Sequence, residues 1–336
     1  MKKIVFIFFL LFCVSVFAQN TKRELLDMSS RVISLDKEIK GVVTIGGTPA
    51  VNAFLFAVGK ANLIKNGVEN NNLRKLPIWE NQTFFQKNIF DLPQVSSNPP
   101  DWNPNYEALL SMEFDIGFVN SALMADKLEK KGIKTAVINW DKPDSIKKTM
   151  IFLGELFQEE KRVEKYLDYY NNNTNMIQSV VNNHNIVKKK AIYLRLDNLS
   201  IPMISTANEL LQKAGASTPT ADLIIENASL NIEKLLVWNP DVLFVWSKND
   251  IKIALTDERF KNLTAVKNKE IYVVPMGAHM WTHYTPEQPL AALWCAKKMY
   301  PESFKHIDIY EEAREFYKEF MNEELSETQL NSILNK

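Results

Sequence analysis

A fifteen-residue segment occurs twice in this chain of 336 residues, and it constrains the fold more than any other feature. Residues 105–119 and 231–245 align without a gap and share seven identities: Asn, Glu, two Leu, Asp, Phe and Val. Each copy starts with apolar residues at helical spacing and ends in a short apolar run typical of a strand. Two convergent helix–strand units would explain the leucines but not the shared Asn, Glu and Asp. We therefore predict two related lobes built on one duplicated unit.

Short apolar runs alternate with helical patterns along the rest of the chain. This alternation is typical of parallel sheets covered by helices, so we predict an α/β protein with two Rossmann-like lobes and parallel-rich sheets. We expect strands near 42–45, 116–119, 135–138, 191–196, 242–245 and 271–274, and helices over 50–58, 106–111, 122–131, 208–214, 232–238 and 289–299.

A long helical pattern separates the two copies of the unit. It runs from 143 to 187 without an internal Pro, and its apolar residues recur at helical spacing. About forty residues at 1.5 Å each would make a rod of roughly 60 Å, and the Asn cluster at 171–173 is the candidate break. We therefore expect an N-terminal lobe over 19–142, one inter-lobe helix over 143–187 and a C-terminal lobe over 188–336.

The first eighteen residues have the pattern of a secretory signal peptide. Lys2 and Lys3 precede an apolar run over 4–12, and Ala18 closes a stretch of small or apolar residues. We expect cleavage after Ala18 and export. Cys13 is the alternative acceptor of a lipid anchor, but Phe12 fits poorly before a lipidated Cys. The Asn- and Lys-rich composition is typical of a low-GC bacterium, so we expect a periplasmic protein.

Charge and cysteine content narrow the function further. The chain has 40 Lys and Arg against 40 Asp and Glu, so no excess charge favours nucleic acid or an anionic membrane. Cys295 is the only cysteine outside the signal segment, which excludes an intramolecular disulfide. Its apolar neighbours predict a buried thiol and not a nucleophile.

Parallel α/β sheets bind ligands beyond the carboxyl ends of their strands, so the residues after each expected strand are the candidate site. The first strand leads into a Gly-Gly turn before a helix, and the last leads into the aromatic loop 276–284. Trp79 and Trp102 lie in a Pro-rich stretch that we expect at the rim. The candidate ligand contacts are Thr48, Trp102, Asn120, Trp140, Arg195, Trp246, His279, Trp281, His283 and Tyr284.

Each candidate has a structural alternative. His279 and His283 are candidate contacts to a metal or metal chelate, but they are also compatible with surface loop residues; their spacing brings the two rings together only in a helical loop. Arg195 is either an anion anchor or the partner of a protein carboxylate. The tryptophans are individually more typical of packing than of a ligand platform, since large aromatic residues dominate protein cores.

The familiar signatures of catalysis do not occur in this sequence. It lacks HExxH, GxSxG, GxxxxGK[ST], CxxC and a GxGxxG motif after a strand. With export and two lobes, this favours binding over catalysis. The competing hypotheses are an exported two-lobed enzyme, such as a chelatase or hydrolase, and a receptor that reports ligand occupancy to a signalling partner.

Several segments together resemble the class III periplasmic binding proteins of iron-siderophore, vitamin B12 and metal-chelate ABC importers. The likeness covers nearly the whole mature chain. Glu113-Phe114-Asp115 departs from the family pattern where a Pro-Asp is usual. The segments that carry the resemblance are Thr48-Pro49 with the helix ending at Gly59, Asn105-Tyr-Glu-Ala-Leu-Leu110, the lobe-joining helix, Leu210-Leu-Gln-Lys-Ala-Gly215, Ile232-Glu-Lys-Leu-Leu-Val-Trp-Asn-Pro-Asp-Val242 and Tyr300-Pro-Glu-Ser-Phe304.

The resemblance implies a monomer that holds a small-molecule ligand between its lobes and delivers it to an inner-membrane permease driven by an ATPase. It implies no enzyme activity and no permanent cofactor, only a transported metal chelate. An aromatic, His-containing site with one Arg favours an iron chelate, such as a ferric siderophore or ferric citrate, ahead of a nickel or cobalt chelate. Molybdate, haem and cobalamin are the alternatives within the family.

The resemblance also suggests docking residues. Glu107 and Glu233 occupy the same place in the two repeats, and the matching residues of related proteins meet Arg on the permease. A structural alternative is that each Glu only favours the dipole of its helix. We expect both leucines of the pairs 109–110 and 235–236 to point inward.

Overall fold

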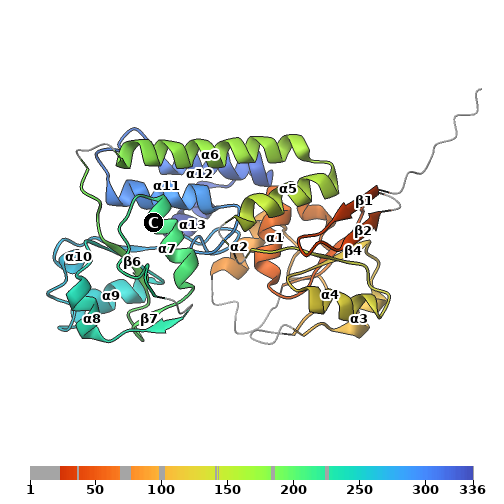
Figure 1. Ribbon diagram of the computed structural model, residues 1–336, viewed down its shortest axis with the longest axis horizontal. Coiled ribbons are helices and arrows are strands. Elements are labelled where there is room, and N and C mark those ends of the chain that lie inside the picture. The colour runs from red at the N-terminus through yellow and green to blue at the C-terminus, as the bar shows by residue number, and fades with distance from the viewer. Residues whose placement is uncertain are drawn as a thin grey trace, which may run out of the picture.

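The computed structural model describes residues 23–35, 38–68, 77–97, 103–140, 142, 144–182, 186–223 and 227–335. The predicted signal segment and Trp102 lie outside the described residues. Two parallel three-stranded sheets lie at opposite ends of an elongated molecule, which confirms the two-lobed α/β prediction (Figure 1). The first sheet has the order β3-β4-β5 and the second β10-β9-β6, formed by β3 (Val42–Thr44), β4 (Ile116–Val119), β5 (Thr135–Val137), β6 (Ala191–Leu194), β9 (Val242–Val245) and β10 (Ile271–Val273).

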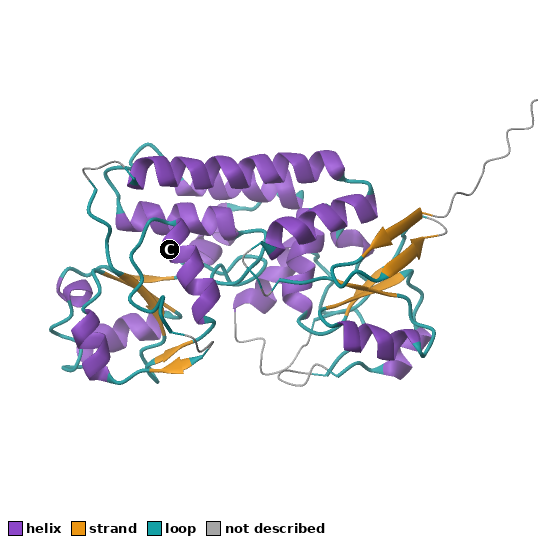
Figure 2. Ribbon diagram, in the orientation of Figure 1, coloured by secondary structure: helices purple, strands orange, loops and turns teal. Residues whose placement is uncertain are grey.

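Helices flank both sheets and form a continuous layer along one long side of the molecule (Figure 2). The predicted helices are present, and two have the expected bounds: α3 (Tyr106–Ser111) and α8 (Ile232–Trp238). The first lobe also contains α1 (Thr48–Ala57), η1 (Ala61–Leu63), α2 (Pro77–Phe85) and α4 (Ala122–Glu129); the second contains α7 (Ile204–Lys213), α9 (Lys248–Thr256), α10 (Thr264–Lys267) and α11 (Gln288–Met299).

The pattern over 143–187 forms two helices and not one rod. α5 (Ser145–Phe157) ends at Gln158, whose φ of 58° is left-handed, and α6 (Glu160–Val181) begins two residues later. The candidate break at 171–173 is wrong, because α6 continues through it with Asn173 buried on the inner face. At 1.5 Å per residue α6 is about 33 Å long, and it runs along the top of the molecule in Figure 1.

A single apolar core continues from one lobe into the other. It joins one face of each sheet to α1, α5, α6 and α11, and its members include Val42 and Phe118 in the first lobe and Phe244 in the second. The opposite face of each sheet packs into a smaller core of its own lobe, around Leu109 in the first and Leu235 in the second. A shared close-packed core resists relative movement of the lobes.

The C-terminal segment returns to helices of the first lobe. α12 (Ile309–Met321) contacts α1, and α13 (Glu327–Leu334) contacts α2. Two small antiparallel pairs were not expected from the sequence: β1 (Arg23–Leu26) with β2 (Val32–Leu35), and β7 (Ser200–Ile201) with β8 (Ala228–Ser229).

The duplicated Asn and Asp have the same structural task in each lobe. The side chain of Asn105 accepts a hydrogen bond from the Ala108 amide (3.1 Å) and Asn231 one from the Lys234 amide (2.8 Å), so each caps its helix. Asp115 Oδ2 accepts from the Gly41 amide, directly before β3, at 3.0 Å. Asp241 Oδ2 likewise accepts from the Lys190 amide, directly before β6, at 2.8 Å. Each Asp therefore ties its own strand to the neighbouring one.

The expectation that both leucines of each repeat point inward is wrong for the second leucine. Leu109 and Leu235 are buried, but Leu110 is 62% exposed and Leu236 is 38% exposed. Adjacent helical residues are about 100° apart, so a short helix with one face on a sheet buries only one of them.

Candidate functional site

Arg195 and Trp246 meet at the strand ends of the second lobe. Arg195 follows β6 and Trp246 follows β9, and these strands are neighbours, so the two side chains emerge side by side. The guanidinium carbon lies 5.4 Å from the centre of the Trp246 ring, within the range of a cation–π contact. Nη2 forms an ion pair with Asp197 at 2.9 Å, so the protein-carboxylate alternative is realised for one nitrogen of the fork.

The other two nitrogens of the fork have no hydrogen-bond partner among the described residues. The side chain of Arg195 is 35% exposed, and among the described residues no hydrogen bond is made by Nη1. Nε is buried and has no hydrogen-bond partner in the described chain. A planar guanidinium held on an aromatic ring and only partly paired suits an incoming carboxylate or oxyanion.

The strand ends of the first lobe are small or uncharged. Gly46 and Gly47 both have positive φ, and a Cβ on Gly47 would lie 2.7 Å from the Trp140 ring. Trp140 therefore covers the turn after β3, and only glycine lets it approach so closely. Asn120 is exposed beyond β4. Thr48 is buried, and its hydroxyl donates to the Thr44 carbonyl at 3.2 Å.

A buried carboxylate fixes the loop 276–284. Glu287 accepts hydrogen bonds from the amides of Ala278 (2.9 Å) and His279 (3.0 Å) and from the Tyr317 hydroxyl (2.6 Å). Burial raises the pKa of Glu287 to about 7, although these hydrogen bonds act in the opposite direction. Gly277 lies directly against this carboxylate and has no room for a side chain. The loop is thus rigid, and the sequence analysis missed Glu287 as its support.

The structure brings His279 and His283 together. His279 Nε2 lies 3.0 Å from His283 Nδ1, and the ring centres are 4.9 Å apart. Burial lowers the pKa of both rings, well below the ordinary value for His279 and to about 4 for His283. Both imidazoles are therefore neutral at pH 7. One nitrogen of each ring takes part in this contact, and His279 Nδ1 is buried without a partner in the described structure.

The other two aromatic candidates of this loop lie in the core. Trp281 is fully buried with its ring 6.4 Å from that of Trp294, in an edge contact. Tyr284 is 1% exposed and donates a hydrogen bond to Glu209 Oε2 at 2.5 Å. Their ligand-binding role stays a prediction. Trp79, expected at the rim, is also buried.

A chain of polar contacts crosses from the first lobe to this loop. Asn52 accepts from the Thr44 hydroxyl at 3.0 Å and donates to Gln82 Oε1 at 2.8 Å. Gln82 then donates to the Ala278 carbonyl, and its neighbour Asn81 donates to the Met276 carbonyl at 2.5 Å. Because these groups are largely buried, the chain fixes the loop of one lobe against strand β3 of the other.

Comparison with known proteins decides the family. A family model described as periplasmic binding protein matches residues 48–277, well over half of the chain. The chain belongs to the periplasmic binding protein family. It is a solute-binding transport protein and not an enzyme. Members of this group work with a membrane permease and ATPase and bind small-molecule ligands, so the catalytic alternative is excluded.

Solved structures and a curated relative agree with this assignment. A periplasmic solute-binding protein from Veillonella parvula superposes with a TM-score of 0.80 at 20% identity, covering 94% of this chain and 97% of that one. Helicobacter pylori CeuE with bound Ni(II) gives 0.71 at 18% identity, covering 93% and 99%. The molybdate-binding protein MolA of Haemophilus influenzae is 23% identical over 273 residues, 72% of this chain and 77% of MolA.

The described part of this binding protein contains no cluster of three or more His, Cys, Asp or Glu arranged to hold a metal ion. Within the same residues no helix is long and apolar enough to cross a membrane. Cys295 is buried, as predicted, and burial raises the pKa of its thiol.

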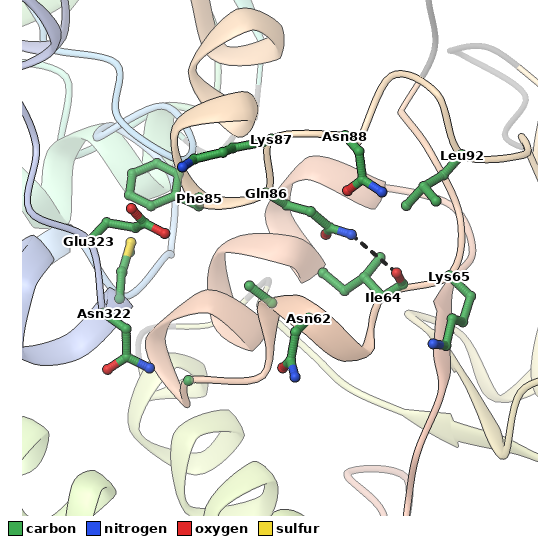
Figure 3. A pocket seen from close by; sticks show the side chains of 13 residues that line it. Asn62, Ile64, Lys65, Phe85, Gln86, Lys87, Asn88, Leu92, Asn322 and Glu323 are labelled. Atoms are coloured by element: carbon green, nitrogen blue, oxygen red, sulfur yellow. Dashed lines mark hydrogen bonds between the residues drawn. The ribbon is translucent and has the colours of Figure 1, made fainter.

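A pocket of 670 Å³ lies elsewhere in the first lobe (Figure 3). α1 starts at the strand end beside Thr48, and the pocket opens past its other end, at Gly59. Gln86 donates to the Ile64 carbonyl at 3.2 Å on its wall. None of the predicted ligand contacts lines it: the polar lining residues are Asn62, Lys65, Gln86, Lys87, Asn88, Asn322 and Glu323.

Proposed function

We propose that this binding protein captures a small anionic metal chelate between its lobes, with Arg195 as the anion anchor, and passes it to an ABC permease. The observation that carries the proposal is the half-paired guanidinium held on Trp246 at the strand ends. Its free donors suit carboxylate or other anionic oxygens. On the opposite side, the partly exposed Trp140 indole lies against the turn at Gly47 and offers an apolar surface to a compact ligand.

A ferric chelate is the first candidate for the cargo, with a nickel or cobalt chelate second. The neutral His279 and His283 pair supports a complex that already carries its own donors, because two imidazoles alone cannot complete a coordination shell. His283 is the better placed of the two for an open coordination position, since the residue as a whole is half-buried whereas His279 is buried.

Molybdate is the second candidate function. The likeness to MolA, whose name states molybdate binding, favours it. An oxyanion and an anionic chelate present the same chemistry to Arg195. The two differ in size and in whether a metal atom is reached by an imidazole.

Titration calorimetry separates these cargoes. We expect micromolar or tighter binding of one among ferric citrate, a nickel–histidine complex and molybdate, and much weaker binding by an Arg195→Gln variant. Binding of molybdate alone would transfer the assignment to the oxyanion. Equal binding by wild type and Arg195→Gln would remove the anchor from the proposal.

Delivery to the permease is assigned to Glu107 and Glu233. Both side chains are exposed, and neither forms an ion pair with another described residue. Exposed carboxylates contribute little to folding but affect docking orientation and encounter rate. A Glu107→Ala, Glu233→Ala variant should keep its melting temperature and ligand affinity and lose uptake through the cognate importer. Normal uptake at limiting ligand would restore the helix-dipole explanation.

Export to the periplasm completes the proposal. It rests on the sequence pattern of residues 1–18 and on family membership. Sequencing the amino terminus of the protein from its own cell envelope should give Gln19 as the first residue, whereas a retained Met1 would contradict cleavage.

A further inference from the structure

The duplicated segment contains two residues per copy that the fold does not require. Of the seven shared positions, the Asn caps the helix and the Asp ties two strands together. The first Leu, the Phe and the Val are buried in both copies. The remaining shared positions are the Glu and the second Leu, that is, Glu107 with Leu110 and Glu233 with Leu236.

These two residues lie on the same face of each helix. A spacing of three places Leu110 one turn after Glu107, and Leu236 one turn after Glu233. All four side chains are exposed, with Leu110 at 62% and Leu236 at 38%. In the second lobe Val237, which is 83% exposed, extends the same face. A helix-dipole role explains the Glu but gives no reason for an exposed Leu.

The two helices lie on the same side of the molecule. Figure 1 places α3 and α8 at the lower edges of the two lobes, away from α6. Helices α4 and α9 lie in the same lower part of the two lobes. Among the described residues nine large apolar side chains are exposed, and five of them are on α3, α4, α8 and α9: Leu110, Leu123, Leu236, Val237 and Leu255.

We infer that Leu110 and Leu236 are apolar anchors that enter two matching sockets of the permease, each socket combining a cationic side chain with an apolar wall. The inference rests on the proposed delivery function. The partner follows from charge complementarity, because each anchor stands beside a carboxylate that forms no ion pair with another described residue. Two equivalent faces on one chain fit a partner built from two equivalent halves. Desolvated leucines supply affinity, and the carboxylates supply steering.

Binding to the reconstituted importer tests this. The permease–ATPase complex of the same bacterium whose ATPase is stimulated by the wild-type protein is placed in nanodiscs, and binding is followed by surface plasmon resonance. We expect Leu110→Gln, Leu236→Gln to weaken binding by about ten-fold or more, by loss of two buried apolar side chains. Leu26→Gln is the matched control, because Leu26 is equally exposed at 62% but lies in β1, outside both faces.

Salt separates the two contributions. The loss caused by Glu107→Gln, Glu233→Gln should shrink as salt is raised, since ion pairs are screened. The loss caused by the leucine variant should persist. Val237→Thr, at the most exposed apolar residue of α8, gives a third variant of nearly unchanged shape, and it should also weaken binding.

The outcomes are distinct. Binding by the leucine variant within two-fold of wild type, while the Glu variant is impaired, overturns the anchors and leaves the delivery function intact. Equal effects of Leu26→Gln and the anchor variant also overturn them. A wild-type protein that stimulates no ABC importer overturns the delivery function, and the anchors with it.

Discussion

At the strand ends of the first lobe the side chains are small or uncharged, whereas the second lobe places a guanidinium on an indole. Both lobes use the same duplicated helix–strand unit, with the same Asn cap and the same Asp between strands. The buried half of the unit is thus kept, and the residues after each strand differ. The same scaffold therefore presents a tight turn against an indole in the first lobe, at Gly47 and Trp140, and a positive charge in the second lobe, at Arg195.

The largest effect is expected at Arg195, because it places a positive charge at the strand ends of the second lobe. Arg195→Gln should weaken binding of the anionic ligand by roughly 10- to 100-fold, the range expected for charge-assisted hydrogen bonds. Arg195→Lys keeps the charge but loses the planar fork, so it should recover only part of the affinity. Calorimetry measures both. Full affinity in Arg195→Gln would mean that ligand binding does not depend on a positive charge at this position in the second lobe.

The turn of the first lobe is the next most sensitive point. Gly47→Ala places a side chain at a positive φ and also displaces Trp140. Gly132→Ala only places a side chain at a positive φ, since nothing lies within 4 Å of its Cβ. We expect Gly132→Ala to lower the free energy of unfolding by about 1 kcal/mol and Gly47→Ala by about 2 kcal/mol. Only Gly47→Ala should also weaken ligand binding. Equal denaturation midpoints for both variants would show that the approach of Trp140 is unimportant.

Acid should destabilise the second lobe through its histidines. His283 has a pKa of about 4 in the folded chain against an ordinary 6.5, so the unfolded chain binds more protons and stability falls as the pH falls from about 6.5 to about 4. Glu287 has the opposite sign: its raised pKa stabilises the fold fully below about 4.5, and that contribution is lost as the pH rises through about 7.

His279→Gln, His283→Gln should flatten the acid limb of a plot of melting temperature against pH. His306→Gln is the matched control, because His306 is exposed. An unchanged acid limb in the double variant would assign the pH dependence to other groups.

The smallest effect is expected for motion between the lobes. The shared core, the contact from Gln82 to the loop 276–284 and helix α6 all restrain the lobes relative to each other. The lobes should therefore close by only a few degrees when the ligand binds. The radius of gyration, about 20 Å for a chain of this length, should change by only a few per cent in small-angle scattering. A large decrease would contradict this. Gln82→Ala should increase the change slightly if the polar chain contributes.

The strands were predictable because they are buried, short and rich in β-branched residues, and all six strands of the two sheets fall within the expected runs. The break between α5 and α6 was not, since Gln158 adopts a left-handed conformation that favours Gly or Asn. The hairpin of β1 and β2 also escaped, because exposed apolar residues such as Leu26 and Val32 obscure its alternation.

The candidate site was only partly predictable. The proximity of Arg195 and Trp246 was predictable, because both residues follow neighbouring parallel strands, which end at the same edge of the sheet. Position after a strand does not distinguish an aromatic residue in a cleft from one in the core, and Trp281 is packed in the core. No sequence pattern marks Glu287, since the role of a buried carboxylate depends on groups that are distant in the sequence but surround it in the fold, such as Tyr317.

The central claim is that this binding protein carries an anionic metal ligand that it releases unchanged. Native mass spectrometry with elemental analysis, on protein isolated gently from its own cell envelope, tests this directly. We predict one metal atom per chain together with the mass of an intact anionic chelator or oxyanion, and the same species after release by mild denaturation. A metal-free chain carrying a neutral organic ligand would contradict the account.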